Sequence, residues 1–209
     1  KNYGDGFTTM YGANHEDIAY SYRTGNHGDG SWYSINGNID YQRTSRKNKQ
    51  RMITFSYKIN TQPQTSNSNT GYEDIHAKEE VDDLVKRLLL KNSQSDGKTN
   101  TMEQTFQVDY TTPIGELHTV EAGAKYIFRR NTSDNKLYEA AGGSDDYLYN
   151  EDRSSDYRHL NHILAAYLGY TLKYKDFTFK PGVRYEQTVQ RVKFFTRTSA
   201  IWCHPFLLA

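Results

Sequence analysis

Histidines and acidic side chains are the residues of this sequence that could act as metal ligands or acid–base groups. The closest histidine pair is His159 and His162. They lie in a segment with β-strand alternation, where positions three apart point to opposite faces, so we expect them not to share a metal ion. The run His15-Glu16-Asp17 is expected to be a solvated loop. The sequence therefore predicts no metal site and no cofactor.

A second cluster is rich in side-chain oxygens and lies in one expected loop: Asp145, Asp146, Asn150, Glu151, Asp152 and Asp156. Such loops can bind calcium, but the spacing of an EF-hand is absent. We expect a solvated outer loop, with calcium binding as the alternative. Nucleophile–base pairs are not visible at strand spacing, so we expect no catalytic residue and no enzyme.

The composition combines a polar average with many aromatic residues. Hydrophobic residues make up 35% of the chain, yet it contains 18 Tyr, 9 Phe and 2 Trp, and the mean hydropathy is −0.90. A wide transmembrane β-barrel has this composition because only alternate residues of each strand face lipid. The net charge of +1 gives no indication of a nucleic-acid partner. No run of 18 apolar residues predicts a transmembrane helix.

Alternation of apolar and polar residues is the main structural signal. It is strict in Ile53-Thr54-Phe55-Ser56-Tyr57-Lys58-Ile59. The same pattern predicts seven strands, most of them long enough to cross a bilayer, over residues 16–23, 31–43, 50–61, 101–113, 116–131, 158–174 and 176–195. Pro181, inside the last of these, is expected to mark a β-bulge near the rim.

The expected connections alternate between short and long. Short turns are predicted at 45–49, 113–116 and 175–176, and longer loops at 25–30, 61–100 and 132–157. Outer-membrane barrels have short turns on the periplasmic side and long loops outside. Within 61–100, Val81, Leu84, Val85, Leu88 and Leu89 have helical spacing and predict a short amphipathic helix.

The strand alternation also assigns side chains to two faces. The residues expected to contact outer-membrane lipid are Phe55, Tyr57, Val108, Tyr110, Val120, Tyr126, Leu168 and Tyr170. The polar residues expected to face the lumen are Asp40, Gln42, Lys58, Gln107, Asp109, Glu121, Lys125, Arg184 and Glu186. These charges would suit either a docked plug or a water-filled pore.

Six stretches together resemble the outer-membrane β-barrel family allied to TonB-dependent receptors: 38–43, 52–57, 106–111, 118–126, 163–170 and 182–186. The resemblance implies a bacterial outer-membrane location and a large all-β barrel, an antiparallel up-and-down meander. It also implies a plug domain, contact with TonB and uptake of a nutrient ligand that the sequence does not identify.

We expect residues 1–198 to form part of such a barrel, and 199–209 to be an atypical tail, truncated or frameshifted. Seven strands are an odd number, so we expect this chain not to close into a barrel by itself. The alternatives to a receptor are a passive pore or structural outer-membrane barrel, and a soluble β-rich binding module.

Overall fold

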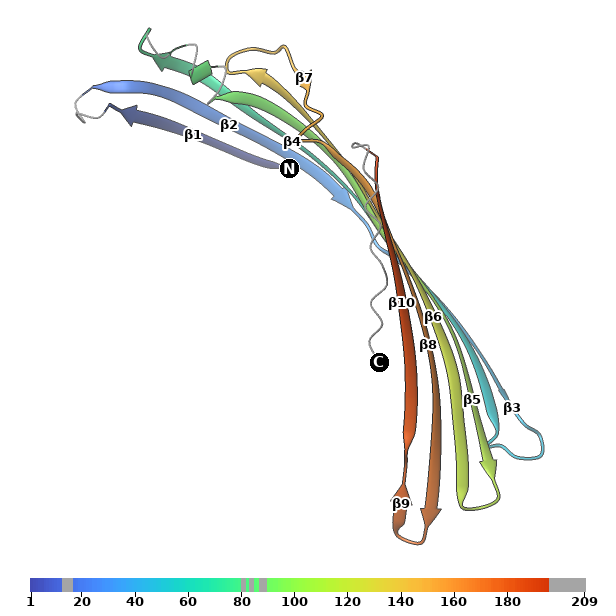
Figure 1. The fold of residues 1–209 in the computed structure, drawn as a ribbon. Coiled ribbons are helices and arrows are strands. Elements are labelled where there is room, and N and C mark those ends of the chain that lie inside the picture. The colour runs from blue at the N-terminus through green and yellow to red at the C-terminus, as the bar shows by residue number, and fades with distance from the viewer. Residues whose placement is uncertain (13–16, 80–81, 83–84, 87–89, 196–209) are drawn as a thin grey trace.

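A single antiparallel sheet makes up nearly all of the protein (Figure 1). The structure is a computed structural model that describes residues 1–12, 17–79, 82, 85–86 and 90–195. The strands are β1 (Asn2–Tyr11), β2 (Ile18–Trp32), β3 (Ile35–Thr44), β4 (Met52–Ala77), β5 (Lys91–Ile114), β6 (His118–Ala141), β7 (Leu148–Tyr149), β8 (Ser155–Tyr174), β9 (Phe177–Phe179) and β10 (Gly182–Phe194). Strands that follow one another in sequence lie side by side, in the order β1-β2-β4-β5-β6-β8-β10. The predicted all-β antiparallel meander is confirmed.

At two places the chain crosses the length of the sheet as two consecutive strands, and we call each such crossing a traverse. β2 pairs with residues 64–77 of β4, and β3 continues the same path along residues 52–61. β9 and β10 divide in the same way at Pro181, which cannot donate a ladder hydrogen bond. The β8 ladder keeps one register across this break, since Leu172 pairs with Phe179 and Gly169 with Gly182. The predicted bulge at Pro181 is therefore wrong.

The predicted strand ends differ from those of the structure. The expected strands 16–23 and 31–43 are β2 and β3 of one traverse, and the expected loop 25–30 lies inside β2. β1 was not predicted at all. It is rich in Gly and polar residues, so it lacks the apolar alternation on which the strand prediction depends.

The two long loops are shorter than predicted. β4 continues to Ala77 and β5 begins at Lys91, so the connection is 78–90 and not 61–100. Likewise β6 continues to Ala141 and β8 begins at Ser155, which reduces 132–157 to a connection of 142–154 that contains β7. These connections lie at one end of the sheet, and the shorter turns 45–51, 115–117 and 175–176 lie at the other (Figure 1).

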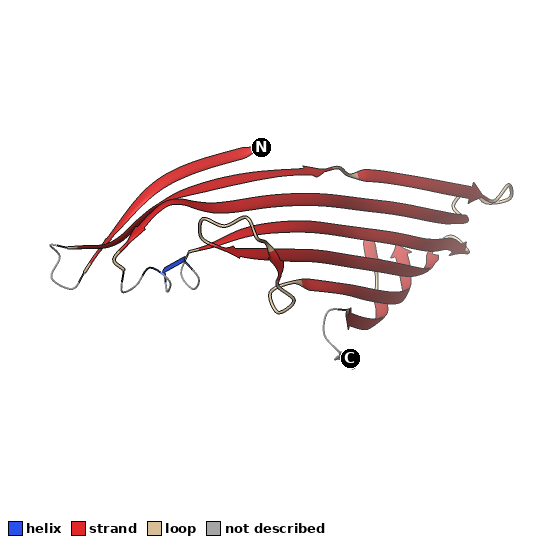
Figure 2. Cartoon of the chain, turned by 90° about the horizontal axis from the view of Figure 1, so that it is seen from above, coloured by secondary structure: helices blue, strands red, loops and turns tan. Residues whose placement is uncertain are grey.

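The central strands are much longer than a bilayer requires. β4 has 26 residues and β5 and β6 have 24 each, which at ~3.3 Å per residue gives roughly 80 Å. The hydrocarbon core is only ~30 Å thick. In these three strands, apolar alternation lies in the half nearest the short turns, such as Met52–Asn60 in β4. The other half, such as Gln62–Thr70, is polar on both faces. The sheet is curved along its length between these halves (Figures 1 and 2).

The strand register separates side chains into two faces, because partners in an antiparallel ladder point to the same side. We call one the apolar face. One of its rows consists of Tyr41, Phe55, Val108, Ala124, Ala166 and Tyr185. All eight residues expected to contact lipid share this face: Phe55, Tyr57, Val108, Tyr110, Val120, Tyr126, Leu168 and Tyr170. We call the opposite side the polar face.

Side-chain burial is very limited, because the sheet is a single layer. Among the described residues, the buried apolar side chains are Val85, Leu90, Ala140 and Ala165. In contrast, Phe106 is 46% exposed, Leu168 52% and Val183 71%, all three on the apolar face. Ring contacts run across this face, with 4.7 Å between the centroids of Tyr57 and Phe106. A contiguous exposed apolar surface of this kind marks a site of contact with a membrane or with another protein.

No helix in the described part of the chain is long and apolar enough to cross a membrane. The predicted amphipathic helix rests on five apolar residues. Four of them lie outside the described residues: Val81, Leu84, Leu88 and Leu89. The tail 199–209 also lies outside the described residues.

Substitutions at neighbouring positions of β5 test the assignment of the faces. Val108→Arg should lower the free energy of unfolding in lipid vesicles by ~2–4 kcal/mol, because Arg on the lipid side of a barrel must enter hydrocarbon. Gln107→Arg should change it by less than about 1 kcal/mol, since this side chain lies on the polar face beside Asp109. Equal losses at the two positions would contradict the assignment.

Candidate functional site: the polar face of the sheet

The candidate site is the polar face within the half of the sheet nearest the short turns. Its register brings together all nine residues expected to face the lumen. One row consists of Gln42, Thr54, Asp109, Gly123, Tyr167 and Arg184, and the next of Asp40, Ser56, Gln107, Lys125, Ala165 and Glu186. Lys58 lies in the row beyond, and Glu121 in the row before. Residues spread over most of the chain therefore form one continuous polar surface.

A hydrogen-bonded group spans three strands at the centre of this face. The Tyr167 hydroxyl on β8 donates to Asp109 Oδ1 on β5 over 2.5 Å. Gln107 Nε2 donates to Asp109 Oδ2 over 2.7 Å. Gly123 of β6 lies between these strands in the same row. A Cβ at Gly123 would lie 2.4 Å from Tyr167 Cε1, so only glycine lets the ring cross β6 to reach the carboxylate.

A hollow of about 430 Å³ lies beside this group, between β3, β4 and β5. Its lining includes the predicted residues Asp40 and Lys58, and Asn38 Nδ2 donates to Asp40 Oδ2 over 2.9 Å. The polar lining residues that are not among the nine predicted ones are Asn36, Asn38, Asn60, Glu103 and Thr105, and Gly37 and Ile59 complete the lining. Asn36 and Asn38 are visible in the alternation of β3. Glu103 and Thr105 join them only through the register of β4 with β5.

Ion pairs cross the same face. Arg129 Nε donates to Glu103 Oε2 over 2.5 Å, and Lys180 Nζ lies 3.6 Å from Glu121 Oε2. Arg184 Nη2 donates to Glu186 Oε2 over 2.7 Å along one strand. Of the nine predicted residues, at least six thus take part in polar contacts with side chains of this face.

Three buried polar atoms lie just beyond the Arg129–Glu103 pair on the polar face. Asn131 Oδ1, His159 Nε2 and Asn161 Oδ1 have no hydrogen-bond partner among the described residues. Asn131 and His159 are register partners, and Asn161 is the partner of Arg129. A buried polar atom without a partner costs ~1–3 kcal/mol, so these three atoms lower the stability of this part of the sheet.

The other candidate groups are separated or have structural contacts. His159 lies on the polar face, whereas His162 lies on the apolar face with Nδ1 2.7 Å from the Tyr126 hydroxyl. The pair is therefore not brought together. Across residues 1–12, 17–79, 82, 85–86 and 90–195, no group of three or more His, Cys, Asp or Glu side chains could hold a metal ion.

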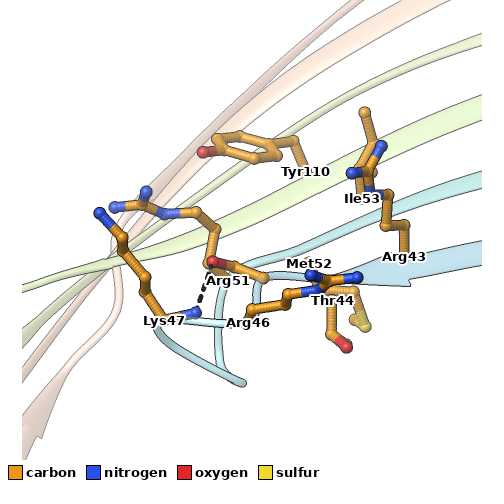
Figure 3. A pocket seen from close by; sticks show the side chains of 9 residues that line it. Arg43, Thr44, Arg46, Lys47, Arg51, Met52, Ile53 and Tyr110 are labelled. Atoms are coloured by element: carbon orange, nitrogen blue, oxygen red, sulfur yellow. Dashed lines mark hydrogen bonds between the residues drawn. The ribbon is translucent and has the colours of Figure 1, made fainter.

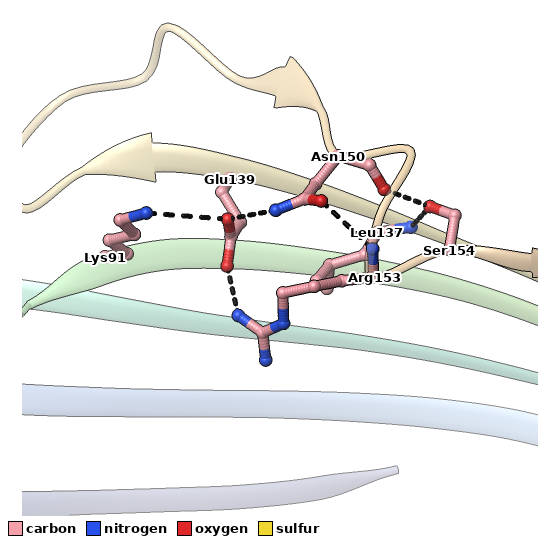
Figure 4. Close-up of polar contacts among 6 residues, drawn as sticks. All are labelled: Lys91, Leu137, Glu139, Asn150, Arg153 and Ser154. Atoms are coloured by element: carbon pink, nitrogen blue, oxygen red, sulfur yellow. Dashed lines mark hydrogen bonds and ion pairs between the residues drawn. The ribbon is translucent and has the colours of Figure 1, made fainter. Parts of the chain in front are cut away.

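A separate polar cluster fixes the connection 142–154 against β6 at the far end of the strands (Figure 4). Glu139 is only 10% exposed. Its carboxylate accepts hydrogen bonds from Asn150 Nδ2 at 2.6 Å and from Arg153 Nη1, and Lys91 Nζ lies 3.8 Å away. Burial by itself would raise the pKa of Glu139, but the Asn150 hydrogen bond and the charges of Arg153 and Lys91 outweigh it and lower the pKa below 4.5.

Backbone hydrogen bonds complete this anchor. The Leu137 amide donates to Ser154 Oγ over 2.9 Å, and Ser154 Oγ donates to the Asn150 carbonyl over 2.6 Å. The Asn150 amide in turn donates to the Leu137 carbonyl over 2.8 Å. The oxygen-rich segment is thus in part a structural anchor of this loop, through Asn150.

Comparison with known proteins identifies the family. A model described as the outer membrane protein beta-barrel family matches residues 43–201. The chain belongs to this family. The matched range runs from the end of β3 through β10 and includes most of the polar and apolar faces. The sheet is accordingly part of a transmembrane β-barrel located in an outer membrane, and not a soluble β-rich module.

Solved structures are also similar at a distance, and one of them is a transporter. The unliganded form of the ferric citrate transporter FecA matches with 14% sequence identity and a TM-score of 0.34, over 84% of this chain. The chain spans 31% of that transporter's length. No curated protein matches the sequence.

Removing the contact between Tyr167 and Asp109 should destabilise the sheet. Tyr167→Phe keeps the ring but loses the hydrogen bond to a carboxylate, so we expect the free energy of unfolding in lipid to fall by about 1–2 kcal/mol. Gly123→Ala should cost at least as much, because its Cβ displaces the ring. Gly169→Ala is the matched control on the same face, where the nearest atom to a Cβ is 3.6 Å away. Equal effects of the two alanines would contradict the proposed fit.

Acid should release the connection 142–154. A carboxylate whose pKa is lowered by folding contributes stability above its unfolded pKa, here about 4.5, and loses it as the pH falls through the folded pKa. The protection factors of the amides of residues 150–154, which correct exchange rates for their intrinsic dependence on pH, should therefore be high above pH 4.5 and decrease below it. Glu139→Gln should exchange faster at neutral pH and lose this acid dependence. An unchanged acid response in Glu139→Gln would exclude Glu139 as the titrating group.

Proposed function

We propose that this chain forms a wall segment of a bacterial TonB-dependent outer-membrane receptor that takes up a nutrient. The observation that carries the proposal is the mixed character of the polar face. Among the nine predicted lumen residues, Asp40, Asp109, Glu121 and Glu186 are acidic, while Lys58, Lys125 and Arg184 are basic. A plug domain docked in the lumen would meet both signs of charge through salt bridges and hydrogen bonds.

The family resemblance of residues 31–195 supports a plugged lumen, because it implies a plug domain. TonB would contact the plug side of the receptor and not this sheet. We propose no catalytic role for the chain.

The long polar strand halves support a role outside the membrane. In β4, β5 and β6 the ladder continues well past the apolar alternation, so these strands extend the wall beyond the lipid. With the short turns in the periplasm, this extension and the connections 78–90 and 142–154 would surround an external entrance, where a ligand is captured before it reaches the plug.

Closure of the barrel requires further strands. In the described sheet, β1 pairs with β2 alone and β10 with β8 alone, and the far side of β3 is also unpaired. Unpaired backbone groups in hydrocarbon cost several kcal/mol each. We therefore propose that this sheet is completed by additional strands of the same barrel.

Photo-crosslinking at two neighbouring positions distinguishes a receptor from a passive pore. A benzophenone amino acid at position 125, on the polar face, should crosslink to a polypeptide segment outside the sheet, identified by mass spectrometry. At position 124, on the apolar face, it should crosslink to phospholipid. A passive pore would give no polypeptide crosslink at 125 and would show stable open conductance in planar bilayers. That combination would overturn the receptor proposal while leaving the barrel intact.

A further inference from the structure

The turn between β3 and β4 is strongly basic. We call residues 43–51 the basic turn. It has five cations, Arg43, Arg46, Lys47, Lys49 and Arg51, and no acidic residue, in a chain whose net charge is only +1. The other two turns of the same rim differ, since Glu116 is the charged residue of 115–117 and Lys175 is followed by Asp176. The basic turn is therefore the densest cluster of positive charge on this rim, which also has Lys173, Lys175 and Lys180 near the turn 175–176.

The charges of the basic turn are not neutralised within the described protein. None of its five cations forms an ion pair with a described residue. Arg51 Nε instead donates a hydrogen bond to the neutral Thr112 Oγ1 over 3.1 Å. Like charges held close together repel one another, so a turn of this composition favours an anionic partner.

The backbone of the basic turn is ordered by its own hydrogen bonds. The Ser45 amide donates to the Arg51 carbonyl over 2.9 Å, and the Arg51 amide donates to the Asn48 carbonyl over 3.0 Å. The Gln50 amide donates to Asn48 Oδ1 over 2.9 Å. The cations therefore project from a fixed loop, which reduces the entropy lost when they bind a ligand.

A hollow of about 610 Å³ lies between the cations and the apolar face (Figure 3). Arg43, Arg46, Lys47 and Arg51 line it together with Ile53 and Tyr110. Ile53 and Tyr110 are register partners in the apolar-face row that also contains Arg43. Cationic side chains and the apolar face thus meet in one place, at the short-turn end of the sheet.

We propose that the basic turn binds the phosphate headgroups of anionic phospholipids in the membrane leaflet at the short-turn rim. The cations contact the phosphates, and the acyl chains continue along Ile53 and Tyr110 on the apolar face. An amphiphile matches both parts of the hollow, whereas a soluble anion matches only the cations. Basic residues near a membrane surface attract anionic lipid with an energy that adds up over the charges. The proposal depends on the membrane position of the sheet and not on its role in uptake.

The test measures retained lipid for the protein reconstituted in nanodiscs. Native mass spectrometry should find phosphatidylglycerol retained in preference to phosphatidylcholine, with retention falling as salt is raised. The variant Arg43→Gln, Arg46→Gln and Lys47→Gln should retain phosphatidylglycerol at least about tenfold less well, as expected for three surface charges. These side chains are exposed, so the substitutions leave the fold intact.

The matched control removes three exposed cations outside the basic turn that form no ion pair with a described residue: Lys98→Gln, Lys173→Gln and Lys175→Gln. It should retain phosphatidylglycerol like the unsubstituted protein. If the two variants lost phosphatidylglycerol retention equally, retention would depend on the net charge of the protein and not on the basic turn, and the proposal would be overturned. So would displacement of the lipid by millimolar inorganic phosphate, which would indicate a site for soluble anions. Failure of the receptor proposal would leave these results unchanged.

Discussion

Backbone hydrogen bonding in a medium without water is the constraint on which this structure depends. In hydrocarbon each amide and carbonyl must pair within the protein, and a sheet achieves this only by laddering every strand to its neighbours. The continuous ladders from β4 through β10 meet that demand. Because the lipid takes the role of a core, the sheet needs few buried apolar side chains, and Phe106 and Leu168 remain open on the apolar face.

The same ladder serves two environments along its length. Near the short turns, alternate residues separate an apolar face from a polar one, so that the wall contacts lipid on one side and polar groups on the other. Farther along, as in Gln62–Thr70, the side chains of both faces are polar, so both faces are suited to contact with water. The Glu139 cluster then fixes the connection 142–154 against β6 at the far end. In the function that we propose, one sheet thus joins a membrane wall to a structure outside the membrane.

The sequence predicted the fold class and the two faces, because apolar alternation reports which side chains of a strand share a face. It failed where that signal is weak. β1 is rich in Gly and polar residues, and the extensions of β4, β5 and β6 are mostly polar, so their pairing depends on backbone groups that every residue carries. The same limit applies to the site. Asp109 was identified from its own strand, but its contact with Tyr167 across Gly123 depends on the register of three strands, which no single segment encodes.

Spin-label accessibility along β5 tests the central claim most directly, namely that one half of the sheet separates lipid from a polar lumen and the other half stands in water. Labels placed singly at residues 102–112 in lipid vesicles should alternate with a period of two, and the positions exposed to oxygen in the bilayer should be those of Phe106, Val108 and Tyr110. Labels at the exposed positions 94, 98 and 99, which belong to both faces, should all be accessible to a water-soluble relaxation agent. Uniform water accessibility over 102–112, or alternation continuing through positions 94, 98 and 99, would contradict the account.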